Sequence, residues 1–505
     1  MPTKLKPVYR KVMGAAALFA GAIYPLGFAP FKWWVIALVS AVLLYIAIKN
    51  AATGRRAFLW AWLFGVGKYA VGASWIYVSI HVHGQAPIPL ALMLVAVFVG
   101  GMALFSGVYG WCWFSVRTGR PVIDVMSFVS IWALGEWLLT WLFTGFPWLF
   151  VGYALLDTPL ASLAPIGGVV LVGVAGLVSV LCVLEAWKRP PLLVVAAVPW
   201  LVAWVIYDQT WVSPVKRFSV ALVQGNIAQE TKWLPESVQP ILERYAALSE
   251  SAWENDLVIW PEAAITVPYT QALPYLTDMA DRTKGALILG VPVLESVSEG
   301  GYVHHNAAVV VGDGSGRYIK RKLVPFGEFV PFEGVLRGVI TFFNLPMSTA
   351  RAGPKQQALA VAAGLKVAIA ICYEVAYPRL VATDAAGADL IVNISNDTWF
   401  GRSIGPMQHM QITRMRALEN GRYLLRATNN GITAIVAPNG KVVSKLPQFE
   451  QGVLVGEVAA MRGLTPYSRW FDMPVVLLSM VLVAVAAVVR RRNKRTQRPL
   501  NAPVV

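Results

Sequence analysis

Long apolar runs fill the first two hundred residues of this chain and constrain its fold more than any other feature. A run of about twenty apolar residues can cross a bilayer as an α-helix, because a helix satisfies its own backbone hydrogen bonds. Only 14% of the residues are charged and the mean hydropathy is +0.57, whereas a soluble protein carries about 25% charged residues. We therefore expect a multi-domain membrane protein.

The apolar runs predict about eight transmembrane α-helices. The first run follows several basic residues, as in a secretory signal, but a second apolar run follows at once, which favours an uncleaved first span. The predicted spans are residues 12–29, 33–48, 57–80, 87–116, 122–143, 160–187, 192–207 and 473–489.

Basic residues in the short loops predict the orientation of these spans, since such loops stay in the cytoplasm. They place both termini in the cytoplasm and the large polar segment outside it. The net charge of +16 is explained by this rule and by attraction to anionic lipid, so no nucleic-acid partner is expected. The basic sites are the N-terminus, Lys49, Arg55, Arg56, Arg117, Arg120, Lys188, Arg189 and Arg490 to Arg492.

The polarity of the chain predicts four parts. Residues 1–210 hold about seven spans, residues 215–462 an outer domain, residues 470–492 the last span and residues 493–505 a basic cytoplasmic tail. In the outer domain, short apolar segments alternate with helical patterns, which is typical of an α/β or layered α+β fold. Of the three cysteines, only Cys372 lies there, so that domain holds a lone thiol.

Residues whose side chains can take part in catalysis or binding follow several predicted strands of the outer domain. Glu262 follows "LVIWP", Cys372 follows "VAIAI", and Asn393 and Asn396 lie around the end of "LIV". Ligands bind beyond the carboxyl ends of strands in open α/β sheets, so one shared cleft is predicted. A polar residue at a single strand end is ordinary, but three such ends in one domain favour a site.

A reactive cysteine needs a base and a cation nearby. Glu262 can serve as the base, because Trp260 and Pro261 offer it apolar surroundings. Lys320, Arg321 and Lys322 compete as the cation, and each could equally be a solvated charge on a hairpin. The five histidines lack metal-ligand spacing, so no metal and no cofactor are expected.

Two ionisable residues, Lys68 and Glu136, lie deepest in the predicted spans. Such groups are functional candidates by default and could mark a transport route. A polar contact between helices is the alternative interpretation.

Seven segments together resemble those of a known family, among them "GASWIYVSIH" and "VQGNIAQETKW", which contains Trp233. "VIWPEAAI", "YIKRKLVPFGEFVPFE" and "AICYEVAYP" are similar to the Glu, Lys and Cys motifs of the nitrilase superfamily. "LGFAPFKWW" and "VNISNDTWFG" are similar to segments of the apolipoprotein N-acyltransferase family, so the resemblance covers nearly the whole chain. More common soluble relatives have an aspartate after the cysteine, where this chain has Tyr373 and Glu374, which favours a lipid-handling member.

The resemblance implies eight membrane helices that carry a nitrilase-like αββα sandwich on the periplasmic side of the bacterial inner membrane. It also implies transfer of a fatty acyl chain from a phospholipid to the α-amino group of the N-terminal diacylglyceryl-cysteine of apolipoproteins. The motifs then make Glu262 the general base, Lys320 the catalytic ammonium and Cys372 the nucleophile. The supporting positions implied are Glu328 as a second glutamate, with Tyr373, Glu374, Trp233 and Asn396 around the thiol and its entrance.

Substrates of this kind suggest an apolar entrance to the site. The segment "VLRGVITFFNLPM", with Phe342 and Phe343, could form a mobile lip that admits acyl chains, or it could simply pack on the domain core. Two other functions stay open on the sequence: a membrane-anchored amidase or nitrilase-type hydrolase, and a transporter whose outer domain has lost catalysis.

Overall fold

The structure is a computed structural model that describes residues 7–296, 301–325, 327–329 and 350–496. The chain divides into two compact units. The helical unit consists of Met1–Ser74, Pro89–Gln209 and Trp470–Val505, and the sheet unit consists of Trp75–Ile88 and Thr210–Arg469. The predicted lip segment, with Phe342 and Phe343, lies outside the described residues.

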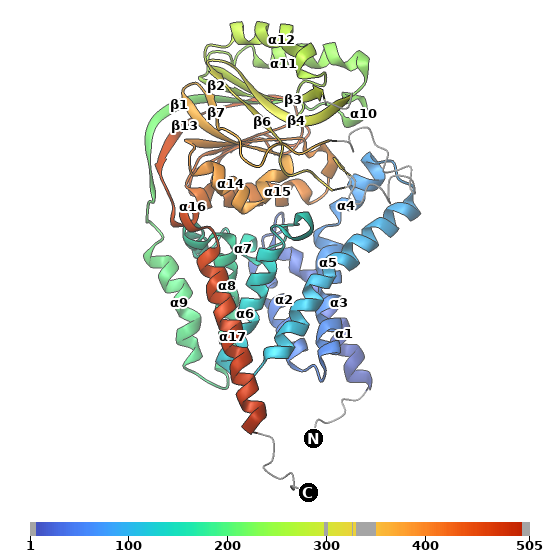
Figure 1. Ribbon diagram of the computed structural model, residues 1–505, viewed down its shortest axis with the longest axis vertical. Helices are drawn as coiled ribbons and strands as arrows, with labels where there is room; N and C mark the ends of the chain where they lie inside the picture. Colours follow the sequence, from blue (N-terminus) through green and yellow to red (C-terminus); the bar gives the residue numbers. More distant parts are fainter. Residues whose placement is uncertain (1–6, 297–300, 326, 330–349, 497–505) are drawn as a thin grey trace. The chain divides into compact units, whose positions relative to one another are not determined.

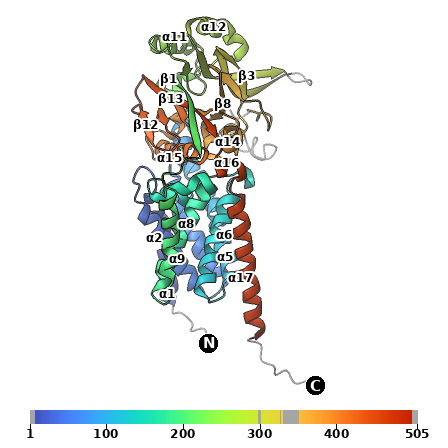
Figure 2. The same ribbon diagram turned by 90° about the vertical axis from the view of Figure 1, so that its left-hand side faces the viewer.

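Long apolar helices form the helical unit. Helices α6, α8 and α17 pack against one another, as Figure 2 shows. The helices, labelled in Figure 1, are α1 (Pro7–Ile23), α2 (Trp34–Lys49), α3 (Gly54–Gly72), α5 (Ile88–Val116), α6 (Pro121–Leu138), α7 (Val151–Ala154), α8 (Ala164–Ala186), α9 (Leu192–Val205) and α17 (Met473–Thr496).

Four of these helical segments are long and apolar enough to cross a membrane, counted over the described part of the chain. They are Ile88–Val116, Pro121–Leu138, Pro159–Ala186 and Met473–Arg495. A fifth candidate joins Gly54–Gly72 to Trp75–His83 across a bend of 54°, and three shorter apolar helices cover Val12–Gly27, Trp34–Lys49 and Leu192–Val205. The chain therefore carries several membrane-compatible helices.

Backbone breaks interrupt two of the predicted apolar runs. The run 57–80 bends after α3, and α4 (Trp75–Val78) with the following π-helical turn Ser79–His83 belongs to the sheet unit. There the Ser79 hydroxyl donates a hydrogen bond to the Trp399 carbonyl over 2.8 Å. The run 160–187 is interrupted at Gly168, where φ is +68°, a conformation that glycine adopts without strain. Hydropathy does not reveal such breaks, because it counts side chains rather than backbone angles.

Two β-sheets form the centre of the sheet unit. One has the strand order β13-β1-β2-β3-β4-β6 and the other β12-β11-β10-β9-β8-β7-β5. The strands are β1 (Val212–Gln224), β2 (Leu257–Ile259), β3 (Ala286–Ser296), β4 (Tyr302–Gly312), β5 (Gly314–Ser315), β6 (Arg317–Ile319), β7 (Ala360–Ala362), β8 (Leu365–Ile371), β9 (Leu390–Ser395), β10 (Leu424–Thr428), β11 (Ala434–Val436), β12 (Val442–Lys445) and β13 (Gly452–Gly463).

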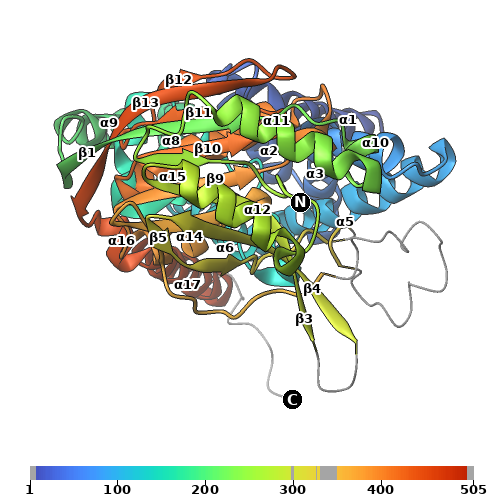
Figure 3. The ribbon, with the colours of Figure 1, turned by 90° about the horizontal axis from the view of Figure 1, so that it is seen from above.

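Helices cover the outer face of each sheet. Helices α11 (Val238–Ser249) and α12 (Tyr269–Arg282) lie over the first sheet, as seen from above in Figure 3. Helices α14 (Pro378–Ala385) and α15 (Gly405–Asn420) cover the second. Short helices complete the unit: α10 (Gln229–Lys232) and α16 (Pro466–Trp470), the latter ending at the unit boundary. This is the αββα sandwich that the resemblance implies.

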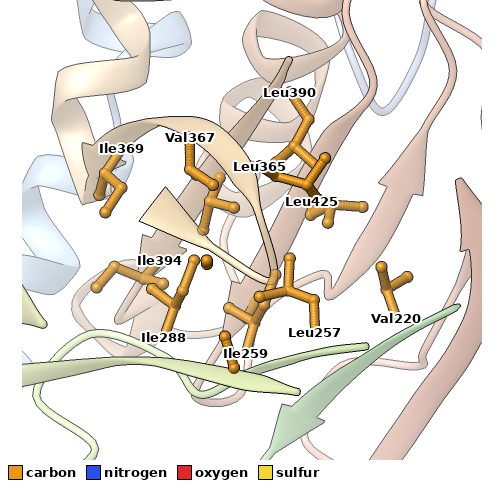
Figure 4. Packing of buried hydrophobic residues seen from close by; sticks show 14 of the residues in the cluster. Val220, Leu257, Ile259, Ile288, Leu365, Val367, Ile369, Leu390, Ile394 and Leu425 are labelled. Atoms are coloured by element: carbon orange, nitrogen blue, oxygen red, sulfur yellow. The ribbon is translucent and has the colours of Figure 1, made fainter. Parts of the chain in front are cut away.

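Aliphatic side chains from both sheets make the core between them, shown close up in Figure 4. Leu257 and Ile259 of β2 and Ile369 of β8 belong to this cluster and are at most 4% exposed. Alternate residues of these strands face the core, because side chains alternate across a strand. Burial of such a side chain stabilises the fold by about 1.5–3 kcal/mol.

Parallel pairing brings the strand ends that carry the candidate site residues to one edge of each sheet. Strand β2 runs parallel to β1 and β3, and β9 runs parallel to β8 and β10. The carboxyl ends of parallel strands meet at one edge of a sheet. Glu262, Cys372 and Asn396 follow such ends.

Candidate active site

A buried ammonium group bridges two carboxylates in the sheet unit. The Lys320 Nζ atom lies 3.2 Å from Glu262 Oε1 and 2.7 Å from Glu328 Oε1. All three side chains are buried, and that of Lys320 is 1% exposed. The structure thus brings together three of the residues predicted from the motifs.

Glu262 is placed by a sharp turn after β2. The next residue, Ala263, has φ +47°, and the carbonyl of Pro261 accepts a hydrogen bond from the backbone N–H of Gly290 on β3. A Cβ atom on Gly290 would lie 2.4 Å from the Ala263 nitrogen, so only glycine allows this close approach. The turn therefore directs the Glu262 carboxylate from the strand end into the site.

Lys320 and Lys322 have different surroundings after the end of β6. The strand stops at Ile319, so the two lysines do not share a face of an extended segment. Lys322 lies half-buried with its ammonium 4.9 Å from the centre of the Tyr377 ring. Arg321 instead pairs with Asp384 and donates to the Lys355 carbonyl over 3.0 Å. Of the three competing cations, only Lys320 contacts Glu262.

Cys372 stands at a strained turn directly after β8. Its φ of +53° lies in the left-handed region, and it opens the short helical turn Cys372–Ala376. Such strain persists only where the surroundings hold it, and it is frequent at catalytic sites. Glu374 supplies part of that support, because its Oε2 atom accepts a hydrogen bond from the Ile371 N–H over 2.8 Å.

Glu374 also ties the cysteine turn to the segment that carries Lys320. Its carboxylate accepts hydrogen bonds from the Tyr318 hydroxyl at 2.9 Å and from the backbone N–H groups of Arg321 at 2.7 Å and Lys322 at 3.0 Å. Glu374 is fully buried. It therefore fixes the position of two predicted site segments, the cysteine turn and the segment after β6.

Charge and burial set the protonation states in the site. Burial alone raises the pKa of Glu262, but Lys320 and the amide donors lower it below the ordinary value. Burial alone lowers the pKa of Lys320, but Glu262 and Glu328 raise it well above the ordinary value. Burial, with the charge of Glu262, raises the pKa of the Cys372 thiol to about 12 against the opposing charge of Lys320. At neutral pH the site holds a carboxylate, an ammonium and a protonated thiol.

The remaining predicted positions differ in their contacts. The Asn396 N–H donates to Glu262 Oε2 over 2.8 Å, so Asn396 belongs to the site through its backbone. Tyr373 is 7% exposed, and its ring packs edge-on against Tyr377 with the centroids 5.2 Å apart. Trp233 is 37% exposed.

Two site residues were missed by the sequence analysis. The Asn306 Nδ2 atom donates to Glu262 Oε1 at 2.7 Å and to Glu328 Oε1 at 3.1 Å. The buried Lys232 donates to the Glu262 carbonyl over 3.2 Å. Asn306 lies inside the strand segment "HHNAAVVV", where nothing but the pairing register places it beside Glu262. Among the described residues, no group of histidine, cysteine or carboxylate side chains is arranged to hold a metal ion.

Both units are similar to known protein families. A family model described as carbon-nitrogen hydrolase matches residues 219–467, and one described as apolipoprotein N-acyltransferase N-terminal domain matches residues 20–183. The apolipoprotein N-acyltransferase of Azotobacter vinelandii is 45% identical over 495 residues, which cover 95% of this chain and 95% of that protein. This chain belongs to the apolipoprotein N-acyltransferase family.

Further relatives from the same family are similar over comparable lengths. The apolipoprotein N-acyltransferases of Pseudomonas paraeruginosa and Pseudomonas syringae pv. tomato are each 43% identical to this chain. Each alignment covers 95% of this chain and 97% of the relative. Family membership therefore rests on the helical unit and the nitrilase-like sheet unit together.

Proposed function

We propose that this chain transfers a fatty acyl group from a phospholipid to the α-amino group of the N-terminal diacylglyceryl-cysteine of apolipoproteins. One observation carries the proposal: Lys320 lies between Glu262 and Glu328 and interacts electrostatically with Cys372 at its strained turn, in a chain of which 95% aligns with a named N-acyltransferase. The site combines a base, a cation and a nucleophile, which acyl transfer through a covalent intermediate requires.

In the first half of the reaction, Glu262 takes the proton of the Cys372 thiol as the sulfur attacks the ester carbonyl of the phospholipid. The Lys320 ammonium stabilises the oxyanion that forms on the carbonyl oxygen. As the carbon–oxygen bond breaks, Glu262 returns the proton to the leaving lysophospholipid, and a thioester remains on Cys372. The raised pKa of the thiol makes removal of the proton during attack, rather than before it, the favoured course.

In the second half, the lipoprotein amine attacks the thioester and loses a proton to Glu262. Lys320 again stabilises the oxyanion, and the proton passes from Glu262 to the departing sulfur. The products are an amide and free enzyme, in a ping-pong cycle. The neighbours support this role: Asn306 and the Asn396 N–H hold the Glu262 carboxylate, and Glu328 keeps Lys320 charged.

The supporting positions follow from the same scheme. Glu374 holds the cysteine turn, Tyr373 borders the thiol, and the exposed Trp233 is assigned to the entrance for lipid substrates. Residues 215–462 are proposed as the catalytic domain, residues 1–210 and 470–492 as its membrane anchor, and residues 493–505 as a basic tail.

Lipid substrates make a membrane location necessary, because exposing an acyl chain to water costs about 0.8 kcal/mol per CH₂. We infer eight spans, which correspond to the four long helices, the bent pair and the three shorter apolar helices. The basic loops support an arrangement with both termini in the cytoplasm and the catalytic domain on the periplasmic side of the bacterial inner membrane.

The test uses the purified full chain in phospholipid vesicles with a synthetic diacylglyceryl-cysteine peptide. We expect amide-linked acyl peptide to accumulate faster than free fatty acid, and the variant Cys372→Ala to form neither. Free fatty acid or released ammonia from small amides, without acyl peptide, would contradict the proposal and indicate a hydrolase. Full activity of Cys372→Ala would exclude the thioester route.

A further inference from the structure

A buried serine lies beside the proposed nucleophile. Ser395 ends β9 and is fully buried; it follows Ile394, which pairs with Ile371 directly before Cys372, and a hydrogen bond from its hydroxyl lowers the pKa of the Cys372 thiol. The same hydroxyl donates to Asp397 Oδ1 over 2.8 Å. One hydroxyl group thus contacts both the sulfur and a carboxylate.

That carboxylate is held independently by an arginine. The Arg426 Nη2 atom donates to Asp397 Oδ1 at 2.9 Å and Oδ2 at 2.7 Å. Both side chains are fully buried. Burial alone raises the pKa of Asp397, but the charge of Arg426 lowers it well below the ordinary value. Asp397 therefore stays ionised at neutral pH and keeps its contacts with Arg426 Nη2 if Ser395 turns away.

The third member of the cluster is a neutral histidine. The His409 Nδ1 atom lies 2.9 Å from Arg426 Nη2. The same Nδ1 atom lies 3.2 Å from Asp397 Oδ1, so its role as donor or acceptor depends on the tautomer. Burial and the charge of Arg426 lower the pKa of His409 against the opposing charge of Asp397. The cluster thus contains one carboxylate and one guanidinium, whose charges balance.

The same guanidinium also reaches the backbone of the nucleophile. Arg426 Nη1 donates to the Asn393 side-chain oxygen, and Asn393 Nδ2 donates to the carbonyl oxygens of Ala370 at 2.8 Å and Cys372 at 3.3 Å. The cluster therefore contacts Cys372 at its carbonyl and, through Ser395, at its sulfur. This arrangement supports the left-handed conformation of the cysteine, where φ is +53°.

We propose that Ser395 is a further catalytic residue, whose hydroxyl donates a hydrogen bond to the Cys372 sulfur whenever that sulfur carries negative charge. In the resting state the hydroxyl proton points to Asp397. When Glu262 takes the thiol proton, the hydroxyl rotates towards the sulfur and Asp397 keeps its contacts with Arg426 Nη2. Asp397 and Arg426 are positioning residues for this movement.

The inference rests on the proposed function, since negative charge develops on the sulfur twice in each cycle. It develops first as the thiol attacks the phospholipid ester, and again as the sulfur leaves the thioester. A hydrogen bond to a charged group contributes about 1.5–3 kcal/mol, and 1.4 kcal/mol corresponds to about a tenfold change in rate. Loss of the hydroxyl should therefore slow both half-reactions at least about tenfold.

The test compares Ser395→Ala with Ser395→Thr, which keeps a hydroxyl, and with Ser249→Ala. Ser249 is a matched control, because it is also fully buried in the sheet unit and its hydroxyl accepts from Trp260 Nε1 over 2.9 Å. The first readout is the rate of Cys372 alkylation by iodoacetamide at pH 9 in the full-length protein, followed by peptide mass mapping. The second is kcat and KM for acyl transfer from phospholipid.

We expect Ser395→Ala to slow Cys372 alkylation about tenfold or more and to lower kcat with KM unchanged, while Ser395→Thr restores both. Ser249→Ala should alkylate and transfer at the rates of the unmodified protein. Unchanged alkylation and kcat in Ser395→Ala would overturn the inference. A second pattern would also overturn it: a lower alkylation rate and kcat in Ser395→Ala that Ser395→Thr does not restore, together with a lower Tm. That pattern would mean that Ser395 has a structural role only. Alkylation needs no substrate, so it tests Ser395 even if acyl transfer itself fails.

Discussion

Two buried lysines show how differently the two units accommodate charge. In the sheet unit, Lys320 lies within 3.2 Å of two carboxylates. In the helical unit, the Lys68 ammonium lies over the rings of Tyr24 and Tyr69, 4.9 and 5.3 Å from their centres, and takes part in no ion pair among the described residues. Both side chains are buried.

The difference fits our proposal that the charge of Lys320 takes part in catalysis, whereas the contacts of Lys68 are those of packing between helices. Paired carboxylates and amide donors fix the protonation and direction of Lys320, as a catalytic ammonium requires. Aromatic faces attract Lys68 without a fixed hydrogen-bond geometry. Glu136 has its own donors, the Trp132 Nε1 atom at 2.9 Å and the Val151 N–H at 2.8 Å. These contacts favour packing between helices as the role of Lys68 and Glu136.

The largest effect is expected from Lys320→Met. This change leaves two buried carboxylates without their cation, and breaking a buried pair costs about 3–5 kcal/mol. Acyl transfer should fall below detection, because the oxyanion loses its stabilising charge. Denaturant unfolding and transfer assays measure both effects. Lys366→Met, on an exposed position of β8, is the control and should change neither.

Glu374→Gln should have a smaller but clear effect. The carboxylate accepts four hydrogen bonds, from the Ile371, Arg321 and Lys322 N–H groups and the Tyr318 hydroxyl. The amide of glutamine accepts only through its one oxygen, so two of the four donors lose their partner, at about 1–3 kcal/mol for each buried group. Melting in detergent measures this loss. The control is Glu295→Gln, because Glu295 pairs with Arg317 at a partly exposed position. A loss of Tm in Glu374→Gln no larger than in this control would show that Glu374 does not hold the cysteine turn.

Lys68→Met is expected to have the smallest effect. Methionine can fill the aromatic site, and replacing an unpaired buried charge with an apolar side chain is often neutral or stabilising. Stability should change by less than about 1 kcal/mol, and acyl transfer should be retained. A loss of transfer as complete as that of Lys320→Met would remove the contrast between the two lysines and assign the helical unit a direct role.

The sequence predicted the parts of the site that motifs carry, and missed those that depend on strand register. Glu262, Lys320 and Cys372 follow strand ends within readable motifs. Asn306 lies inside a strand and reaches Glu262 only through the pairing of β3 with β4. Ser395 and Arg426 lie on the neighbouring parallel strands β9 and β10, where Ser395 pairs with Thr428 and Arg426 with Asn393, in segments that read as ordinary buried strands.

The helical unit shows the same limit. The apolar runs predicted where long helices lie, because about twenty apolar residues suit a membrane span. The bend after Gly72 and the break at Gly168 were not predicted, since apolar composition does not report backbone angles. In the sequence, only the family resemblance distinguishes Lys320 from Lys322, because spacing does not show where β6 ends.

The most direct test is the intact mass of the purified protein after incubation with phospholipid, compared with Cys372→Ala. Our account predicts a gain of one acyl group on Cys372 that hydroxylamine removes and that a diacylglyceryl-cysteine peptide discharges, with no such gain in the variant. The account would be contradicted if active protein supplied with lipid never carried the acyl group. It would also be contradicted if Cys372→Ala carried the acyl group to the same extent.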